Sequence, residues 1–402
     1  MGVSEPTMKQ LLDAACDDPA FLAALQDSVA ASAPPQAIDD LPSITGIADE
    51  TTARLITFMR RINGFPRFNA QYGAVGDDYW LLPPSLLVSM HDIASRASSH
   101  SHLWHAAQRL AHQGLPDQRL FEDIRAAALR DKLILPTEAL RAIIVHGEAP
   151  RTSGERLVAN TLCFIRETAE GTNSLRRGDY EGVLQRITEG TAFAWTPQSP
   201  SQQPLPPTIL AGLQRWGTHP LFGLLMHSEV MWYHRPFPAC NGLMEVACRH
   251  AACHRIGMPA LSLVPLSSLH STYHVPNYAV PAGDFGVDRT EELLELIDLI
   301  TESLIEAERA LLAAEEEMAL RKQRISLDYR LNHRQVALAH RMIDDPTLVI
   351  DVGSYRQQFD VALTTARDDL KRLVELDYCR TAYQGKRQIF WPNGLTDKPV
   401  LR

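Results

Sequence analysis

The chain lacks the features that would place it in a membrane or in a secretory pathway. None of its 402 residues belongs to a run of about twenty uncharged apolar residues, so we expect no transmembrane helix and no membrane partner. The N-terminal stretch MGVSEPTMKQLLDAACDDP carries acidic residues where a secretory signal has its apolar core. These absences predict a cytoplasmic protein.

Cysteine and net positive charge are also scarce. The six cysteines are scattered through a large chain and read as reduced thiols, many of them in cores. They are Cys16, Cys163, Cys240, Cys248, Cys253 and Cys379. The net charge of −9 gives no global signal for nucleic-acid binding, although it leaves room for a small basic face.

What the chain has in quantity is helix-forming sequence. Its length and its 45% hydrophobic content suit two or three domains with a sizeable core. Apolar residues recur at helical spacing, and there is little alternation of apolar and polar residues before residue 345, so the main body is predicted to be mainly α. We predict an N-terminal helical extension over 1–45, a helical domain over 46–325 and a small α+β domain over 332–396.

The longest periodic segment runs over residues 289–324. Its apolar stripe and its order of charges, acidic first and basic last, predict one long amphipathic helix that closes the helical domain. The stripe is wider than a strict heptad seam. A homodimer contact through this helix is the alternative interpretation.

The stretch HSEVMWYHRPFPACNGLMEVACRHAACHRI predicts a helix, a tight loop and a second helix. Pro236, Pro238 and the pair Asn241-Gly242 interrupt the helical pattern, which resumes at Leu243. A polar turn that opens a buried helix is a usual site for anions, because its free N–H groups and the helix dipole face the turn.

The loop HRPFPACNG resembles the signature loop of Fic-domain proteins. That signature runs His-Pro-Phe, any residue, an acidic residue, Gly, Asn-Gly-Arg and a second Arg three residues later. Pro236, Phe237, Asn241 and Gly242 match it in spacing. The preceding segment THPLFGLLMHSEVMWYH resembles the helix before the family's loop and places the family's histidine at His234, so that Arg235 looks like a one-residue insertion.

The resemblance implies a Fic-like helical bundle and a set of roles for the loop. His234 would be the general base on a protein hydroxyl, Phe237 the buried anchor, and Asn241 with Gly242 turn formers or phosphate contacts. ATP and Mg²⁺ would be cofactors only in an active enzyme, because such transfer depends on positioning and charge neutralisation. No cofactor is otherwise assigned.

The chain departs from the signature at the residues that would bind nucleotide. Ala239 stands at the acidic position and cannot ligate a metal, and Leu243 and Val246 stand at the two arginine positions. Candidate replacements are Arg235, Arg249, Arg255 and Glu245. Two interpretations follow: a catalytically degenerate regulator, or an active transferase of AMP or a phosphoryl group that uses His234.

Self-restraining members of the family carry a short helix with Ser or Thr, three residues, Glu, then Gly or Asn. The best positional match, ALRAIIVHGE, places Ala142, His146 and Gly147 there, so both functional side chains are absent. A loop without phosphate-binding arginines has no need of that brake.

Two other chemistries are weighed for the second helix. Cys248, His250, Cys253 and His254 crowd it, but their spacing matches no zinc motif, and core thiols with partly exposed histidines explain them more simply. No metal site is assigned. Cys240 as a nucleophile with His234 as its base is a further alternative, set against a small buried residue that replaces glycine.

Residues 332–396 predict a helix, a strand, two helices and a hairpin about Gln384-Gly385-Lys386. This is the order of a winged helix–turn–helix, and it resembles the module at the C-terminus of many bacterial Fic proteins. Its third helix and wing supply the candidate DNA-binding residues Thr364, Thr365, Arg367, Lys371, Arg372, Lys386 and Arg387. Asp368 and Asp369 in the same helix oppose DNA contact. A purely structural or protein-binding domain is therefore kept as the alternative.

Overall fold

The structure is a computed structural model of the chain. It describes residue 13 and residues 17–30, 49–68, 75–111, 115–172, 179–193, 220–229, 231, 235, 237, 239–272, 288–385 and 387–393. His234 and Lys386, both predicted site residues, lie outside these ranges.

The described chain is mainly helical, with a small antiparallel sheet of three strands near the C-terminus, as the sequence predicts. The helices of the main body are α2 (Pro19–Ala30), α3 (Asp49–Asn63), α4 (Pro84–Ala97), α5 (His102–Arg109), α6 (Leu115–Arg130), α7 (Thr137–Ile144), α8 (Ser153–Ala169), α9 (Tyr180–Thr188), α11 (Pro220–Glu229), α12 (Asn241–Arg255), the 3-10 helix η4 (Pro259–Leu263), α13 (Leu266–Thr272) and α14 (Thr290–Ser326). The C-terminal elements are α15 (His333–Asp344), β3 (Ile350–Asp351), α16 (Val352–Phe359), α17 (Leu363–Glu375), β4 (Cys379–Gln384) and β5 (Arg387–Pro392).

The chain divides into two compact units. The first comprises Met1–Trp104 and Gln118–Ile305, and the second comprises His105–Asp117 and Glu306–Arg402. The long helix predicted over 289–324 is present as α14, and it contributes residues to both units. No helix among the described residues has the length and apolar content needed to cross a bilayer.

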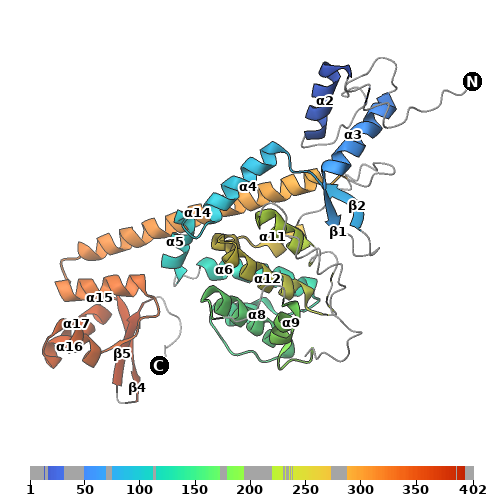
Figure 1. Ribbon diagram of the computed structural model, residues 1–402. Coiled ribbons are helices and arrows are strands. Elements are labelled where there is room, and N and C mark those ends of the chain that lie inside the picture. The colour runs from blue at the N-terminus through green and yellow to red at the C-terminus, as the bar shows by residue number, and fades with distance from the viewer. Residues whose placement is uncertain are drawn as a thin grey trace, which may run out of the picture. The chain divides into compact units, whose positions relative to one another are not determined.

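The first unit is organised around α12. Helices α6, α8, α9 and α11 lie about it in Figure 1. A continuous apolar cluster joins α12 to α6, α7, α8 and α9, and every residue of α12 from Asn241 to Cys253 is buried. Such a helix has no solvent-facing stripe, which marks it as the centre of the bundle.

The main body is mainly α, as predicted, and it also contains one short two-stranded hairpin at residues 65–80. There β1 (Phe65–Phe68) pairs antiparallel with β2 (Val75–Trp80), and the register shifts between Pro66 and Phe68. The hairpin is anchored by a long-range contact: Asp288, just before α14, bridges to Tyr79 and accepts a 2.7 Å hydrogen bond from the buried Arg60 Nε. Partners distant in sequence thus stabilise strands that have no alternating pattern.

The second unit contains the predicted order of helix, strand, helix, helix and hairpin. Its sheet has the strand order β3-β5-β4, and the β4–β5 hairpin pairs from Cys379–Pro392 to Gln384–Arg387. Residues from α15, α16, α17 and the sheet form one apolar cluster with Ile325 of α14. Asn332 starts α15 with a complete capping box, in which its side chain accepts from Gln335 N–H and the Gln335 side chain accepts from Asn332 N–H.

Candidate functional site

The loop before α12 holds two non-glycine residues in the left-handed conformation. Arg235 has φ 45° and Cys240, the residue before α12, has φ 59°. Left-handed backbone is unfavourable for residues with a side chain, so surrounding contacts must hold the loop in place. The side chain of Arg235 is exposed, and its guanidinium donates to the carbonyl of Arg130 at 3.1 Å.

Asn241 closes this loop with a reciprocal pair of hydrogen bonds. Its Oδ1 accepts from the backbone N–H of Phe237, and its Nδ2 donates to the Phe237 carbonyl, both at 2.8 Å. Phe237 itself is buried against Tyr180, with ring centroids 6.2 Å apart. The amide group of Asn241 is therefore engaged in shaping the turn, and the Phe237 side chain is buried beside it.

The N-terminus of α12 is occupied by a carboxylate from another part of the chain. Asp131, which directly follows α6, accepts hydrogen bonds from Gly242 N–H at 2.8 Å and Leu243 N–H at 2.9 Å. The first N–H groups of a helix have no partner inside it, and the dipole favours an anion at this end. Asp131 therefore fills the position of an external anion. Burial raises the pKa of the Asp131 carboxyl. The two N–H donors and the charges of Arg235 and Arg130 lower this pKa, but burial has the larger effect.

Gly242 is required by close packing. A Cβ at this position would lie 2.4 Å from the carbonyl oxygen of Ala127 in α6. Because the obstacle is backbone, it cannot turn aside as a flexible side chain would. The glycine thus lets the start of α12 approach α6 closely enough for Asp131 to reach its N–H groups.

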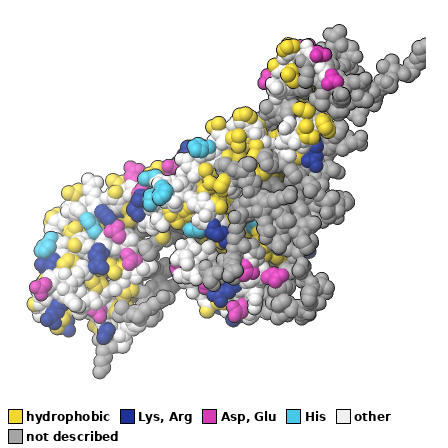
Figure 2. All heavy atoms as spheres, in the orientation of Figure 1, with side chains coloured by type: hydrophobic (Ala, Val, Ile, Leu, Met, Phe, Trp, Pro, Cys, Tyr) yellow, Lys and Arg dark blue, Asp and Glu magenta, His cyan; other side chains and the backbone are white. Residues whose placement is uncertain are grey.

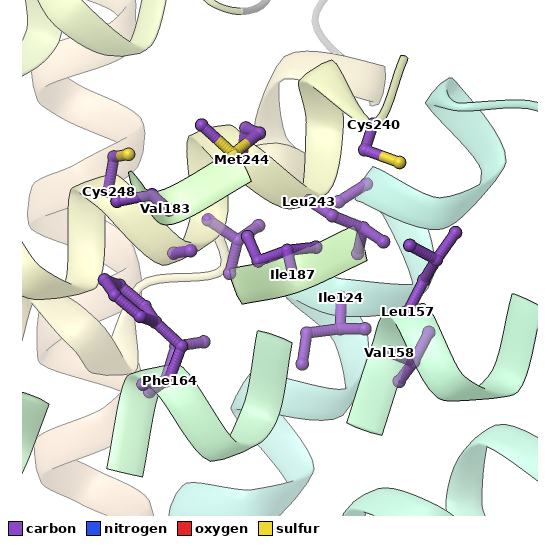
Figure 3. Packing of buried hydrophobic residues seen from close by; sticks show 14 of the residues in the cluster. Ile124, Leu157, Val158, Phe164, Val183, Ile187, Cys240, Leu243, Met244 and Cys248 are labelled. Carbon is purple, nitrogen blue, oxygen red and sulfur yellow. The ribbon is translucent and has the colours of Figure 1, made fainter. Parts of the chain in front are cut away.

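The two positions that carry arginine in the resembled signature are core positions in this chain. Leu243 and Val246 are both 0% exposed. Figure 3 shows Leu243 and Met244 within the apolar cluster, together with Val183 and Ile187 of α9. Both positions serve the packing of the bundle and present no cation to a ligand.

Farther along α12, a fully buried polar network holds the helix to its neighbours. Arg249 Nε donates to Glu245 Oε1 at 2.6 Å, and an Arg249 amino group donates to Asp123 Oδ2 in α6 at 2.5 Å. Ser267 donates from its hydroxyl to Glu245 at 3.0 Å and from its backbone to Asp123 at 2.9 Å, and the Ser228 hydroxyl donates to Glu245. Burial alone raises the pKa of Asp123, yet the Arg249 guanidinium and His250 hold it below its usual range.

This network removes two of the proposed replacements for the missing phosphate ligands. Arg249 and Glu245 are already paired with each other, and Glu245 is 0% exposed. Arg255 is exposed at the far end of α12, about 20 Å along the helix from Asn241. Arg235 remains beside Asp131.

The cysteines of α12 and His250 are core residues, whereas His254 is partly exposed, as predicted. Burial raises the pKa of the Cys240, Cys248 and Cys253 thiols to about 12, which keeps them protonated and unreactive. His250 is 3% exposed, not partly exposed as predicted, and burial lowers its pKa. Within the described ranges, no group of three or more His, Cys, Asp or Glu residues is arranged to hold a metal ion.

The segment that matches the family's inhibitory helix forms α7 and the turn after it. Ala142 lies within α7, whereas His146 and Gly147 are exposed beyond its end, Gly147 with φ 67°. A cavity of about 530 Å³ adjoins α7 and is lined by side chains of both charges, among them Arg141, His146 and Glu148.

In the C-terminal unit, α17 carries most of the predicted DNA-binding residues. Thr364, Arg367 and Lys371 are exposed, and Thr365 and Arg372 are half-buried. Arg372 and Lys371 both approach Glu375, at 3.2 and 3.8 Å. Arg387 is exposed at the start of β5. Figure 2 shows basic and acidic side chains interspersed over the C-terminal helices at its left.

Asp369 does not lie on this exposed face of α17. The expectation that its charge opposes DNA contact is therefore wrong. Its carboxylate is 5% exposed and accepts from Asn332 Nδ2 at 2.6 Å, Arg334 Nε at 2.8 Å and Tyr355 Oη at 3.1 Å. These contacts join the starts of α15 and α16 to α17. Asp368, the adjacent residue, is exposed.

Sequence reasoning missed Asp131 and Asp123, which do most to fix α12. Both follow or belong to α6, more than a hundred residues before their partners. The sequence offers one indication, for Asp131 alone. An acidic residue at the C-terminal end of a helix is disfavoured by the helix dipole, which suggests that its carboxylate has another partner. Nothing in the spacing connects these residues to α12.

The chain is similar to the crystal structure of a Fic family protein from Desulfovibrio desulfuricans G20, with 16% sequence identity and a TM-score of 0.41, over 83% of this chain and 100% of that one. That protein belongs to the family that the loop before α12 resembles. No protein-family model matches the chain, and no curated protein matches it in sequence.

Proposed function

We propose that the chain is a divergent Fic-type regulator whose transferase loop is catalytically degenerate and whose output is DNA binding through a C-terminal winged helix–turn–helix. The observation that carries the first half is the Asp131 carboxylate on the N-terminus of α12. In the family that the loop resembles, this is where nucleotide phosphate is expected. A phosphate brought there would meet the half-buried carboxyl group of Asp131 in place of free N–H groups.

The residues around that position support the same proposal. The signature's two arginine positions are buried leucine and valine, and Arg249 is held by two carboxylates. Loss of a cation clamp in phosphoryl transfer removes about three to five powers of ten in rate. The left-handed Arg235 next to His234 displaces the loop from the family's spacing, and a shift of about 1 Å can reduce a rate a hundredfold.

Labelled nucleotide tests the degenerate loop. The full chain is incubated with Mg²⁺ and ATP labelled at the α- or the γ-phosphate, beside His234→Ala, and ATP binding is followed by calorimetric titration. We expect neither protein to bind ATP at millimolar concentration or to acquire label. Label that depends on His234 overturns the proposal and establishes the active transferase of AMP or of a phosphoryl group.

DNA as the output is supported by the α17 face. The Asp369 side chain is buried and does not contribute to the surface of α17. The charged residues left on that surface are three basic ones and two acidic ones, so its net charge is positive. They are Arg367, Lys371, Arg372, Asp368 and Glu375. A helix of this position in a winged domain enters the major groove, and contacts to phosphate supply much of the affinity.

Retention on random duplex DNA over a salt series tests this output. Binding should weaken as salt rises, and Arg367→Ala with Lys371→Ala should reduce the log–log salt slope by about 1 for each lost phosphate contact. The control, Arg151→Ala with Arg255→Ala, removes the same charge from exposed positions of the first unit. Equal retention of both double variants would show that α17 does not read DNA and would favour a protein partner.

A further inference from the structure

The second half of α14 carries an exposed stripe that none of the described residues of the second unit covers. Leu312 is 45% exposed, Leu320 47%, and Leu327, immediately after the helix, 74%. Glu316 and Arg324 are exposed between them. At about 100° per residue, these five positions fall within an arc of roughly 120° on one side of the helix.

This stripe, residues 312–327, is distinct from the side of α14 that packs inward. The inward side is formed by Ala307, Leu311 and Ile325, which are all buried. Three large apolar side chains aligned over about 22 Å of helix form a repeated surface feature rather than scattered exposure. Neither Glu316 nor Arg324 makes an ion pair with another residue among those that the structure describes.

The stripe is complementary to itself in one orientation. If a second copy lies antiparallel with its two-fold axis at Leu320, that leucine meets its own counterpart and Ala313 faces Leu327 of the second copy. Glu316 of each copy then faces Arg324 of the other, which gives two opposite-charge contacts. A parallel pairing would place Glu316 against Glu316 and Arg324 against Arg324, and like charges across an interface are strongly unfavourable.

We propose that α14 mediates an antiparallel homodimer through the stripe 312–327, centred on Leu320. The contact is isologous, because the same patch serves both copies about a two-fold axis. A helix pair of about 22 Å buries less than the roughly 1,600 Å² of a standard interface, so we expect a weak, reversible dimer. The proposal does not depend on the function of the loop or of α17.

Charge exchange across the stripe tests both the contact and its orientation. Sedimentation equilibrium of the full chain over a micromolar concentration series should show a reversible dimer. Glu316→Arg or Arg324→Glu alone places like charges in both contacts and should raise the dissociation constant at least about tenfold. The double variant Glu316→Arg with Arg324→Glu restores both contacts and should return to within about threefold of the original value.

Two further measurements guard against misfolded variants. Mixing the Glu316→Arg protein with the Arg324→Glu protein should give a heterodimer, because every facing pair is then of opposite charge. Arg356→Glu, the same charge change at an exposed arginine on α16, should leave the dimer unchanged.

Several outcomes overturn the proposal. A wild-type chain that stays monomeric through the series excludes the dimer. A Glu316→Arg protein that dimerises as the wild type does excludes the stripe as the contact. A double variant that remains monomeric, with single variants that form a heterodimer on mixing, excludes the antiparallel register.

Discussion

At the scale of single residues, the first unit depends on polar groups whose charge state burial controls. His227 in α11 is 2% exposed and stacks on Tyr180, with ring centroids 5.7 Å apart. Burial lowers the pKa of His227 from 6.5 to about 3, and the charges of Arg255 and Arg249 act in the same direction. The imidazole is therefore neutral in the folded protein at ordinary pH.

His227 should make the stability of the first unit depend on pH. The unfolded chain takes up a proton on this residue below pH 6.5, whereas the folded chain does so only near pH 3. The stability that the neutral imidazole confers is thus fully present above pH 6.5 and lost as the pH falls toward 3. Urea unfolding of His227→Phe between these limits should show a slope smaller than that of the wild type by about 1.4 kcal/mol per pH unit. Equal slopes would mean that the folded imidazole is charged.

At the scale of elements, the start of α12 depends on its close approach to α6. Gly242→Ala places a methyl group against the carbonyl of Ala127, and neither backbone can yield without moving a helix. We expect a loss of about 3 kcal/mol in unfolding free energy, measured by urea titration.

Gly353→Ala is the control for this prediction. It also lies in the first turn of a helix, but the added methyl would meet only the side-chain oxygen of Asp351, at 3.2 Å. A change of less than about 1 kcal/mol is expected there. Equal losses at both positions would show that the contact with Ala127 is not what requires glycine at 242.

Substitution of the two adjacent aspartates in α17 should have very different effects on the free energy of unfolding. Asp369→Ala leaves Arg334, Asn332 and Tyr355 without their shared acceptor, and a loss of about 3 kcal/mol in unfolding free energy is expected. Asp368→Ala alters an exposed side chain and should change stability by less than about 0.5 kcal/mol. A loss at Asp369 no larger than the loss at Asp368 would contradict the inward orientation of Asp369.

At the scale of the whole molecule, two apolar cores share no residue. One surrounds α12, and the other lies among α15, α16, α17 and the three-stranded sheet. Gly242→Ala and Asp369→Ala therefore act on different cores. By calorimetry, the losses in the double variant should equal the sum of the single losses to within about 0.5 kcal/mol, because the two sites have no common partner. A marked departure from the sum would show that the cores are energetically coupled.

The sequence was informative wherever a pattern is local. Helical periodicity placed α14, and turn chemistry at Gln384-Gly385 placed the β4–β5 hairpin. The sequence was uninformative wherever a structural feature depends on a contact between residues that are far apart in the chain. The β1–β2 hairpin, the inward turn of Asp369 and the carboxylate on α12 all depend on residues brought together only by folding.

For the loop before α12, the sequence by itself determined the chemistry that is missing. The side chains of Ala239, Leu243 and Val246 cannot bind a metal or a phosphate in any fold, because they carry no ligand atom. Only the tertiary structure shows what meets the N–H groups at the start of α12: Asp131 from the end of α6 accepts from Gly242 and Leu243. The physical reason is that a helix N-terminus must find some acceptor, and sequence spacing does not reveal which distant residue supplies it.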